Sequence, residues 1–428
     1  MKRKVLILLI LIFPWWSTLL SQKILTLKEC YDLAAAASAL AGEKDSYTSI
    51  SGIRDNNLSK GWLPTLDANA SAAYNSDVVD FKNASLPGLA NVLNTMPHEQ
   101  YKITLDINQV IYDGGAIKSA RAIEKTDLRI NEKQTETDLY KLRNQINTYY
   151  FNILLLDRQR ELLINYLNLL NKRISSLQSA LNNGVILRSD IDVLTSEQIK
   201  IEQQLAENSL HKTSLNKVLS DLTGASVDDS TRLILTDQKI EMTNKLLRPE
   251  LQIFDLRKDQ LTASLQAVQS KRMPKAFGFA TLGYGNPPGN DFFNNTFDTY
   301  YIVGGGIKWN IFDWNKAKNE KHVITIQQDI IEKRKKDLED NLNRLLESKN
   351  AEIKSLESMI QSDSSLIKLR KKITLSAESQ YRNGNITATE YLNEMNTEQQ
   401  AMINYEIHKI SLALARIEYL NISGQEIE

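Results

Sequence analysis

The chain has 428 residues, with 52 basic and 52 acidic side chains and a single cysteine, Cys30. This balance leaves no net charge to attract nucleic acid, so we predict no nucleic-acid partner. One cysteine excludes an intramolecular disulfide and any Cys-x-x-Cys metal or redox motif. We expect Cys30 to be a small buried residue of the first helix.

The N-terminus has the pattern of a secretory signal peptide. Met1–Lys4 is basic, and the apolar run from Val5 to Phe13 is too short to span a bilayer as a helix. We therefore predict a signal peptide at 1–21, with cleavage after Ser21. No later apolar run approaches the ~18 residues of a membrane helix. An exported chain of this kind is soluble, peripheral, or crosses a membrane as strands.

The rest of the sequence repeats itself at an offset of 200 residues (311 − 111, 384 − 184 and 424 − 224). The repeated landmarks are Ile111-Tyr112-Asp113 and Ile311-Phe312-Asp313, Asn183-Gly184 and Asn383-Gly384, and Thr223-Gly224 and Ser423-Gly424. This period is far longer than the roughly 20–50 residues of solenoid repeats. We predict two duplicated halves, 22–224 and 225–428, each with a complete set of elements.

Four segments are predicted strands because apolar and polar residues alternate in them, at about 65–76, 101–112, 276–286 and 300–312. The alternation is clearest in the second, whose apolar face holds Tyr101, Ile103, Leu105 and Ile107 and whose polar face holds Lys102, Thr104, Asp106 and Asn108. A half-buried strand of a soluble sheet has the same alternation.

The neighbours of these strands favour a membrane location. Strands of about 10 residues with aromatic residues near their ends are typical of outer membrane barrels, and Trp62, Trp309 and Trp314 lie near strand ends. The signal peptide and the long helices described next point the same way. We therefore expect the four polar residues from Lys102 to Asn108 to face a barrel lumen.

The segments 114–222 and 315–422 are predicted to be long helical hairpins. Between Ala116 and Leu222 there is no proline and only one glycine, Gly184; the second hairpin has only Gly384. Apolar residues recur at steps of 3 and 4, the spacing of helices packed along their length. A continuous helix from Ala116 to Asn183 would reach roughly 100 Å. The chain would reverse near 184 and near 384.

Four strands do not close a membrane barrel, and an open sheet edge in lipid leaves backbone groups without hydrogen bonds. The sequence therefore predicts an oligomer in which neighbouring chains pair strand to strand. Two chains would give eight strands around a plugged interior. Three chains would give twelve strands and a pore.

Several phrases resemble the TolC-like outer membrane efflux protein family, over essentially the whole mature chain. They are the opening Leu25–Ala34, the strand entries Trp62-Leu63-Pro64 and Arg272-Met273-Pro274, and the turns at Gly184 with Asp190–Leu194 and at Tyr381–Gly384 with Glu390–Leu392. The resemblance implies a mixed fold of α-helix and transmembrane β-strand. A homotrimer would form a twelve-stranded β-barrel in the outer membrane, continued by a long α-helical coiled-coil tunnel through the periplasm of a Gram-negative-type bacterium.

The resemblance also implies a function. The trimer would be a passive exit duct, without cofactor, docked to a periplasmic adaptor protein and to an inner-membrane transporter of the resistance-nodulation-division or ABC type. Adaptor contact is implied for the turns: Gly184, Val185, Ile186, Leu187, Arg188 and Ser189 in the first, and Gly384, Asn385, Ile386 and Thr389 in the second.

The resemblance places the periplasmic entrance of the duct at Asp190, Tyr381, Glu390 and Asn393. Three copies of Glu390 would form an acidic ring that favours cations. The family has a second carboxylate where this chain has Asn393, and a basic residue where it has Ile386. We hypothesise a latch between Tyr381 and Asp190. First-turn carboxylates such as Asp190 and Glu390 also stabilise a helix by themselves.

No enzyme motif is present, because the four histidines are isolated and Gly304-Gly305-Gly306 lacks the lysine-hydroxyl pair of a phosphate loop. Within an alternating strand we expect these glycines to serve packing or bends. The alternative function is an exported periplasmic coiled-coil scaffold or adaptor without a pore. Within the duct hypothesis, drug, metal, peptide and protein export remain open.

Overall fold

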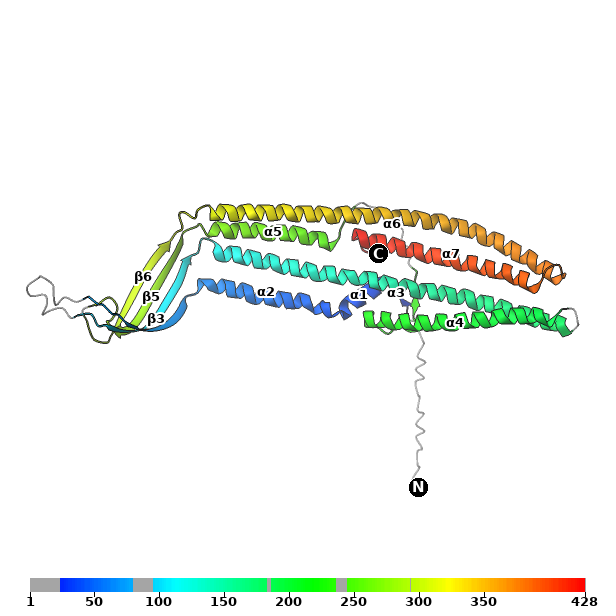
Figure 1. The fold of residues 1–428 in the computed structure, drawn as a ribbon, viewed down its shortest axis with the longest axis horizontal. Helices are drawn as coiled ribbons and strands as arrows, with labels where there is room; N and C mark the ends of the chain where they lie inside the picture. The colour runs from blue at the N-terminus through cyan, green and yellow to red at the C-terminus, as the bar shows by residue number, and fades with distance from the viewer. Residues whose placement is uncertain (1–23, 80–94, 183–185, 236–244, 293, 428) are drawn as a thin grey trace, which may run out of the picture.

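The computed structural model describes residues 24–79, 95–182, 186–235, 245–292 and 294–427. The molecule is a long rod, with strands at one end and the turns of two helical hairpins at the other (Figure 1). The predicted signal peptide and two residues of the first turn, Gly184 and Val185, lie outside the described residues.

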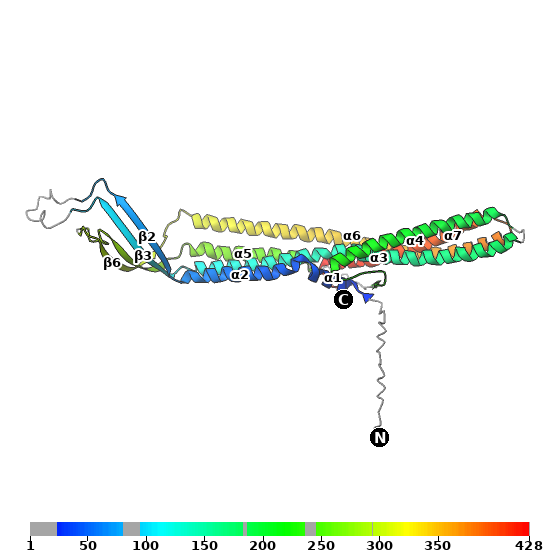
Figure 2. The ribbon, with the colours of Figure 1, turned by 90° about the horizontal axis from the view of Figure 1, so that it is seen from below.

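A four-stranded antiparallel sheet occupies one end of the rod. Its strands are β2 (Thr65–Tyr74), β3 (Glu99–Tyr112), β5 (Lys275–Asn286) and β6 (Asp298–Lys308), in the order β2-β3-β5-β6. Each repeat contributes one hairpin, and the hairpins join where β3 pairs with β5. The edge strands β2 and β6 each have one side without a partner strand in the described chain, and the sheet is strongly curved (Figure 2).

The fourth strand is shorter than the sequence predicts, because it ends at Lys308 rather than near 312. Lys308 lies opposite Lys275, the first residue of β5. Pro274 precedes Lys275 and has no N–H to donate, so the ladder ends there. The next residues leave the sheet, and the Trp309 indole donates a hydrogen bond to the carbonyl oxygen of Arg272 (3.0 Å).

Long helices form the rest of the rod. The first hairpin consists of α3 (Ala116–Asn182) and α4 (Arg188–Thr223), the second of α6 (Lys316–Arg382) and α7 (Ala388–Ser423). The two repeats match, with helices of 67 and 36 residues in each. At 1.5 Å per residue the longer helix measures about 100 Å. Gly224 and Gly424 end both hairpins in the left-handed conformation, with φ of 65° and 81°.

Shorter helices complete a single layer. Next to the sheet, α2 (Glu43–Ser59) packs on α3, and α5 (Pro249–Ser270) packs between α3 and α6. The lateral order α2-α3-α5-α6 therefore follows the strand order. Towards the turns α4 and α7 take over the places of α2 and α5, beside α3 and α6 (Figure 1).

The main hydrophobic core lies at the middle of the rod. Helix α1 (Leu27–Ala37) packs there against α3 and α4, and the short parallel pair β1 (Ile24–Leu25) and β4 (Arg232–Leu233) covers it. Cys30 is fully buried in this core, as predicted. Tyr150 of α3 holds the residue after β4 against this core, because its hydroxyl accepts a hydrogen bond from Ile234 N (3.1 Å) and donates one to Ile234 O (2.8 Å).

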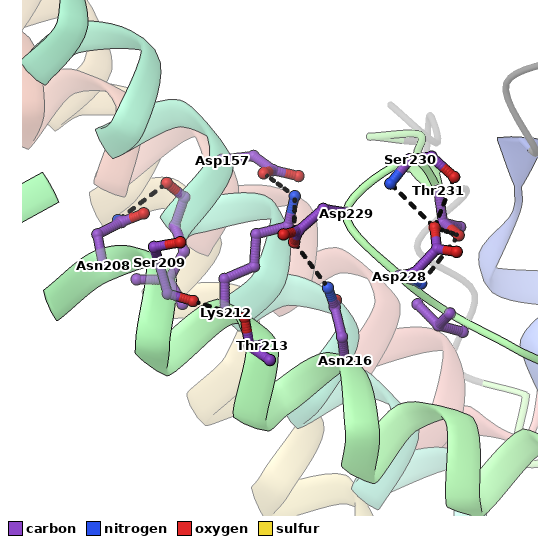
Figure 3. A network of polar contacts seen from close by, with 12 residues as sticks. Asp157, Asn208, Ser209, Lys212, Thr213, Asn216, Asp228, Asp229, Ser230 and Thr231 are labelled. Carbon is purple, nitrogen blue, oxygen red and sulfur yellow. Dashed lines mark hydrogen bonds and ion pairs between the residues drawn. The ribbon is translucent and has the colours of Figure 1, made fainter. Parts of the chain in front are cut away.

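A polar network fastens the segment after α4 to the first hairpin (Figure 3). Lys212 of α4 lies with its side chain 6% exposed, its Nζ 2.7 Å from Asp157 of α3 and 3.8 Å from Asp229. Asn216 donates to the Asp229 carboxylate (3.3 Å). The Asp228 carboxylate in turn accepts from the backbone N–H and the hydroxyl of Ser230. A buried ammonium is stable only with such partners, so the network fixes this loop.

Candidate functional site

The sheet has one polar and one apolar face. Asp106 of β3 lies opposite Asp67 of β2 and Thr281 of β5. Its carboxylate accepts hydrogen bonds from Thr281 (2.6 Å), Thr104 (2.8 Å) and Asn69 (2.8 Å). The network joins three neighbouring strands. Lys102, Thr104, Asp106 and Asn108, the residues predicted for a lumen, therefore share one face of the sheet, because they alternate along β3.

The opposite face presents large apolar side chains to the exterior. Tyr301, Val303 and Ile307 of β6 are 77%, 74% and 77% exposed. Ile103 of β3 and Leu282 of β5 belong to the same face and are 61% and 55% exposed. A contiguous apolar surface of this kind marks a site of contact with lipid or another protein.

The glycines of β6 make room for aromatic rings on the polar face. A Cβ added at Gly304 would lie 2.6 Å from Cζ of Phe279, and one at Gly306 would lie 2.7 Å from Cζ of Phe277. The two rings therefore lie flat across the neighbouring strand. The predicted packing role of Gly304 and Gly306 is confirmed. In the β5–β6 register, Phe279 lies opposite Gly304 and Phe277 lies opposite Gly306.

At the other end of the rod, the turn of the second hairpin is a tight cap. Gly384 adopts φ 70°, and Thr387 and Glu390 form a reciprocal capping box at the start of α7. The backbone N–H and hydroxyl of Thr387 donate to the Glu390 carboxylate (2.8 and 3.0 Å). These hydrogen bonds hold the pKa of Glu390 below its ordinary value. Glu390 thus stabilises its own helix, and the side chain remains exposed.

In the first hairpin, Asp190 has a similar position. Its carboxylate accepts a hydrogen bond from Leu187 N (3.3 Å) at the start of α4. Leu187 is 71% exposed and Ser189 is exposed, as are Gly384, Thr389 and Asn393 in the second hairpin. Ile386 differs, because it packs against the hydrophobic cluster between the hairpins.

Tyr381 lies at the predicted entrance, and no hydrogen bond joins it to Asp190. Its buried hydroxyl has no hydrogen-bond partner among the described residues. The ring instead stacks on Tyr391, with centroids 5.5 Å apart and planes 8° apart. Burial, followed by the charge of Asp190, raises the pKa of Tyr381 to about 12. The two residues are therefore electrostatic neighbours, and the contact that holds Tyr381 is aromatic.

Near the turns, two polar contacts between described residues join the hairpins, and the sequence pattern predicted neither. Arg173 of α3 lies 2.5 Å from the carboxylate of Glu378 of α6, with side chains 23% and 17% exposed. Glu378 also pairs with Arg382 (2.6 Å). Further along, the Tyr166 hydroxyl donates to Asn396 of α7 (2.6 Å). These pairs lie at separations of more than 200 positions, for which the sequence pattern gives no register.

Around these contacts the hairpins share a hydrophobic cluster. It contains Leu163, Tyr166, Leu170, Leu194, Ile201, Ala377, Ala388, Tyr391, Leu392 and Met395. Helices α3 and α4 thus pack on α6 and α7 near the turns through one apolar patch with two polar links. In the part of the chain that the structure describes, no group of three or more His, Cys, Asp or Glu side chains is arranged to hold a metal ion.

None of the described helices combines the length and the apolar character needed to cross a membrane. The sequence profile of the outer membrane efflux protein family matches residues 57–225, which is most of the first repeat. A comparison with curated protein sequences gives no match.

Solved structures extend the likeness to the whole chain. The crystal structure of CusC superimposes with a TM-score of 0.71 at 12% identity, covering 94% of this chain and 92% of that chain. The Campylobacter jejuni CmeC outer membrane channel gives 0.64 at 15% identity over 93% and 85%. The open state of the Neisseria gonorrhoeae MtrE outer membrane channel gives 0.66 at 15% identity over 93% and 89%. At these identities the likeness shows the fold.

The comparisons confirm the resemblance to the TolC-like outer membrane efflux family and the predicted fold class. The described chain has a four-stranded sheet continued by long helices, which is the fold of these channels.

Proposed function

We propose that the chain is the outer membrane channel of a tripartite efflux or type I secretion system, because residues 57–225 match the outer membrane efflux protein family and the whole chain shares the fold of such channels. The observation that carries this proposal is the four-stranded sheet with open edges and an exposed apolar face, continued by helices of about 100 Å. Such a chain suits a passive duct from the periplasm to the exterior.

Both lateral edges of the chain support a homotrimer. Strands β2 and β6 have backbone groups that only a neighbouring chain can pair within lipid. The helices at the two lateral edges also have exposed apolar side chains that a neighbouring chain could cover. In α4 these are Ile199 (52% exposed) and Leu210 (74%), and in α6 they are Leu345 (53%) and Leu369 (58%). Three chains joined β6 to β2 would close twelve strands, enough for a pore. The apolar face would then meet lipid, and Lys102, Thr104, Asp106 and Asn108 would line the lumen.

The hairpin turns are the proposed periplasmic end. The exposed residues Leu187, Ser189, Gly384 and Thr389 offer a surface for a periplasmic adaptor, which would link the channel to an inner-membrane transporter of the resistance-nodulation-division or ABC type. Gly184 and Val185 belong to the same predicted surface and lie outside the described residues. Glu390, exposed at the start of α7, is proposed to form the acidic ring of the entrance in the trimer.

Membrane extraction tests the proposal against the alternative of a periplasmic scaffold. The duct proposal expects the mature protein in the outer membrane fraction, as a trimer in detergent that dissociates to monomers only on heating. It also expects ion-conducting pores when the trimer is added to a planar bilayer. A soluble monomer or dimer in the periplasmic fraction would establish the scaffold instead.

A further inference from the structure

The two repeats make the same turn from strand to long helix with different residues. The first repeat uses Asp113-Gly114-Gly115, with φ of 70° and 88° at the glycines. The second uses Asp313-Trp314-Asn315, with φ of 53° and 63° at the last two residues. Both aspartates cap the helix that follows: Asp113 accepts from Ile117 N (2.5 Å) and Asp313 from Ala317 N (3.0 Å). The second repeat therefore holds a bulky residue in a left-handed conformation that glycine adopts freely.

Within the described chain, little holds the Trp314 ring in place. The side chain is 83% exposed, and its aromatic contact is the edge of Phe312, with ring centroids 4.8 Å apart. Phe312 and Ile311 are themselves 66% and 72% exposed. A strained backbone that projects a large indole into the exterior suggests that something outside the chain stabilises it.

The charge around the two turns differs as well. Residues 307–321, which contain the second turn, have four basic and two acidic side chains, a net charge of +2 (4 − 2). Residues 107–121 of the first repeat have two basic and one acidic, a net charge of +1 (2 − 1). The two acidic groups of the second turn are engaged, since Asp313 caps α6 and Glu320 pairs with Lys271 (3.1 Å). Lys308, Lys316 and Lys318 are exposed.

The position of this turn identifies its partner. It follows β6 directly at the junction of sheet and helices (Figure 1), so it continues the apolar face that ends at Ile307. A hollow of about 680 Å³ lies beside it, with the apolar side chains of Trp314, Val268, Val323 and Ile324 and the polar side chains of Asp313, Lys316, Asn319 and Glu320 in its lining. Indole and phenyl rings prefer the boundary between acyl chains and headgroups, and lysines at that depth bind phosphate.

We propose that the strand-to-helix turn of the second repeat is a binding site for anionic phospholipid headgroups at the periplasmic surface of the outer membrane. The rings of Trp314 and Phe312 lie at the level of the glycerol groups, and Lys316 and Lys318 contact the phosphates. This inference rests on the proposed function, because it requires the sheet to lie in the outer membrane. A neighbouring subunit suits the site less well, since the edge of β2 that it would bring is preceded by the basic residue Lys60.

Fluorescence of a single-tryptophan trimer tests the proposal. Of the five tryptophans, Trp15 and Trp16 lie in the predicted signal peptide, so Trp62→Phe and Trp309→Phe leave only Trp314 in the mature chain. The trimer is reconstituted in phosphatidylcholine vesicles whose acyl chains carry bromine either near the headgroup or near the methyl end. The proposal expects the shallow bromines to quench Trp314 at least about two-fold more than the deep bromines. Equal quenching, or none, would overturn it.

Thermal unfolding of the same trimer tests the headgroup charge. Adding phosphatidylglycerol to the vesicles should raise the unfolding temperature of the wild type, and the Lys316→Gln/Lys318→Gln variant should lose at least half of that rise. Lys118→Gln, at the matching place in the first repeat, is the control and should keep it. An equal rise in all three proteins would show that the site does not select anionic lipid.

The Trp314→Gly variant distinguishes lipid from a neighbouring subunit. It restores the residue type of the first repeat, so the trimer in detergent should be as stable as the wild type or more stable. Dissociation of this variant in detergent would mean that Trp314 packs between subunits, which would overturn the proposal. If the wild-type protein failed to form a conducting trimer at all, the proposed function would fail first.

Discussion

The ion pair between Arg173 and Glu378 gives the sharpest prediction about opening of the entrance. Replacing Arg173 by alanine removes a contact of 2.5 Å between the two repeats, in surroundings where both side chains are mostly buried. Exposed pairs contribute up to about 1 kcal/mol, and breaking a fully buried one costs about 3–5 kcal/mol. Arg382 still neutralises Glu378 in the variant, so we expect Arg173→Ala to destabilise the closed entrance by about 1–2 kcal/mol.

That loss corresponds to a roughly 5- to 30-fold rise in the ratio of open to closed entrances. Single-channel recording of the purified trimer in planar bilayers measures this ratio as open probability. Arg173→Lys should restore part of the closed population, because it keeps the charge and loses the planar geometry.

A matched control is available on the same helix. Arg158 pairs with Glu161 one turn away (2.8 Å), with both side chains about half exposed, and it does not join the repeats. Arg158→Ala should leave the open probability unchanged. If Arg173→Ala also left it unchanged while the trimer remained folded, the pair would not hold the entrance and this reasoning would be wrong.

Five further predictions concern other parts of the chain. Tyr381→Phe should keep the closed state, because the hydroxyl has no hydrogen-bond partner among the described residues, whereas Tyr381→Ala should raise the open probability; equal conductance of both variants would contradict the stacking role. The pKa of Tyr381 is raised to about 12 in the folded protein. The folded state should therefore keep its full stability below pH ~10, the pKa of a free tyrosine, and lose part of it as the pH rises towards 12. Thermal unfolding of Tyr381→Phe should lack this part of the loss. The pKa of Glu390 is lower in the folded protein than in the unfolded chain. Its contribution to the free energy of unfolding is therefore present above the unfolded-state pKa and declines as the pH falls through the folded-state pKa. Glu390→Gln should remove this part of the acid sensitivity, measured by circular dichroism between neutral and acid pH. Gly304→Ala should push the Phe279 ring off the sheet, destabilise the protein by about 1–3 kcal/mol and lower the conductance, while Gly305→Ala, on the other face, should do neither. Lys212→Met should cost about 1–2 kcal/mol in unfolding free energy, less than a fully buried pair because Asp157 and Asp229 are 33% and 59% exposed, and adding Asp157→Leu should recover part of it.

Most of the fold could be predicted because its signals are local. Alternation along Tyr101–Asn108 and the absence of proline and glycine through α3 each act within one element, so the pattern determines strand or helix directly. The 200-residue offset then placed the second set of elements. Where a boundary depended on a partner strand the prediction was less accurate, and β6 ends early because Pro274 ends the ladder with β5.

The candidate site was harder to predict, because its contacts join distant helices. Resemblance gave the place of Tyr381, Asp190 and Glu390. It did not predict that Tyr381 stacks on Tyr391. Arg173 and Glu378 meet only after α3, α7 and α6 have packed together, and a heptad pattern leaves their axial register open. Likewise, the packing of Phe279 on Gly304 and of Phe277 on Gly306 could not be predicted without the register of β5 and β6.

The contacts between the repeats indicate which part of the entrance moves. Both polar links near the turns start from α3, with Arg173 contacting Glu378 of α6 and Tyr166 contacting Asn396 of α7. Within the second hairpin, α6 and α7 pack on each other along their length, so this hairpin can shift as a unit without losing its own core. Opening would then separate α6 and α7 from α3 at the apolar cluster around Leu170 and Tyr391. If so, a bifunctional thiol reagent with a reducible spacer, attached to Arg173→Cys and Glu378→Cys, should hold the channel closed, and reduction of the spacer should restore conductance. A cross-linked trimer that conducts like the wild type would place the moving contact elsewhere.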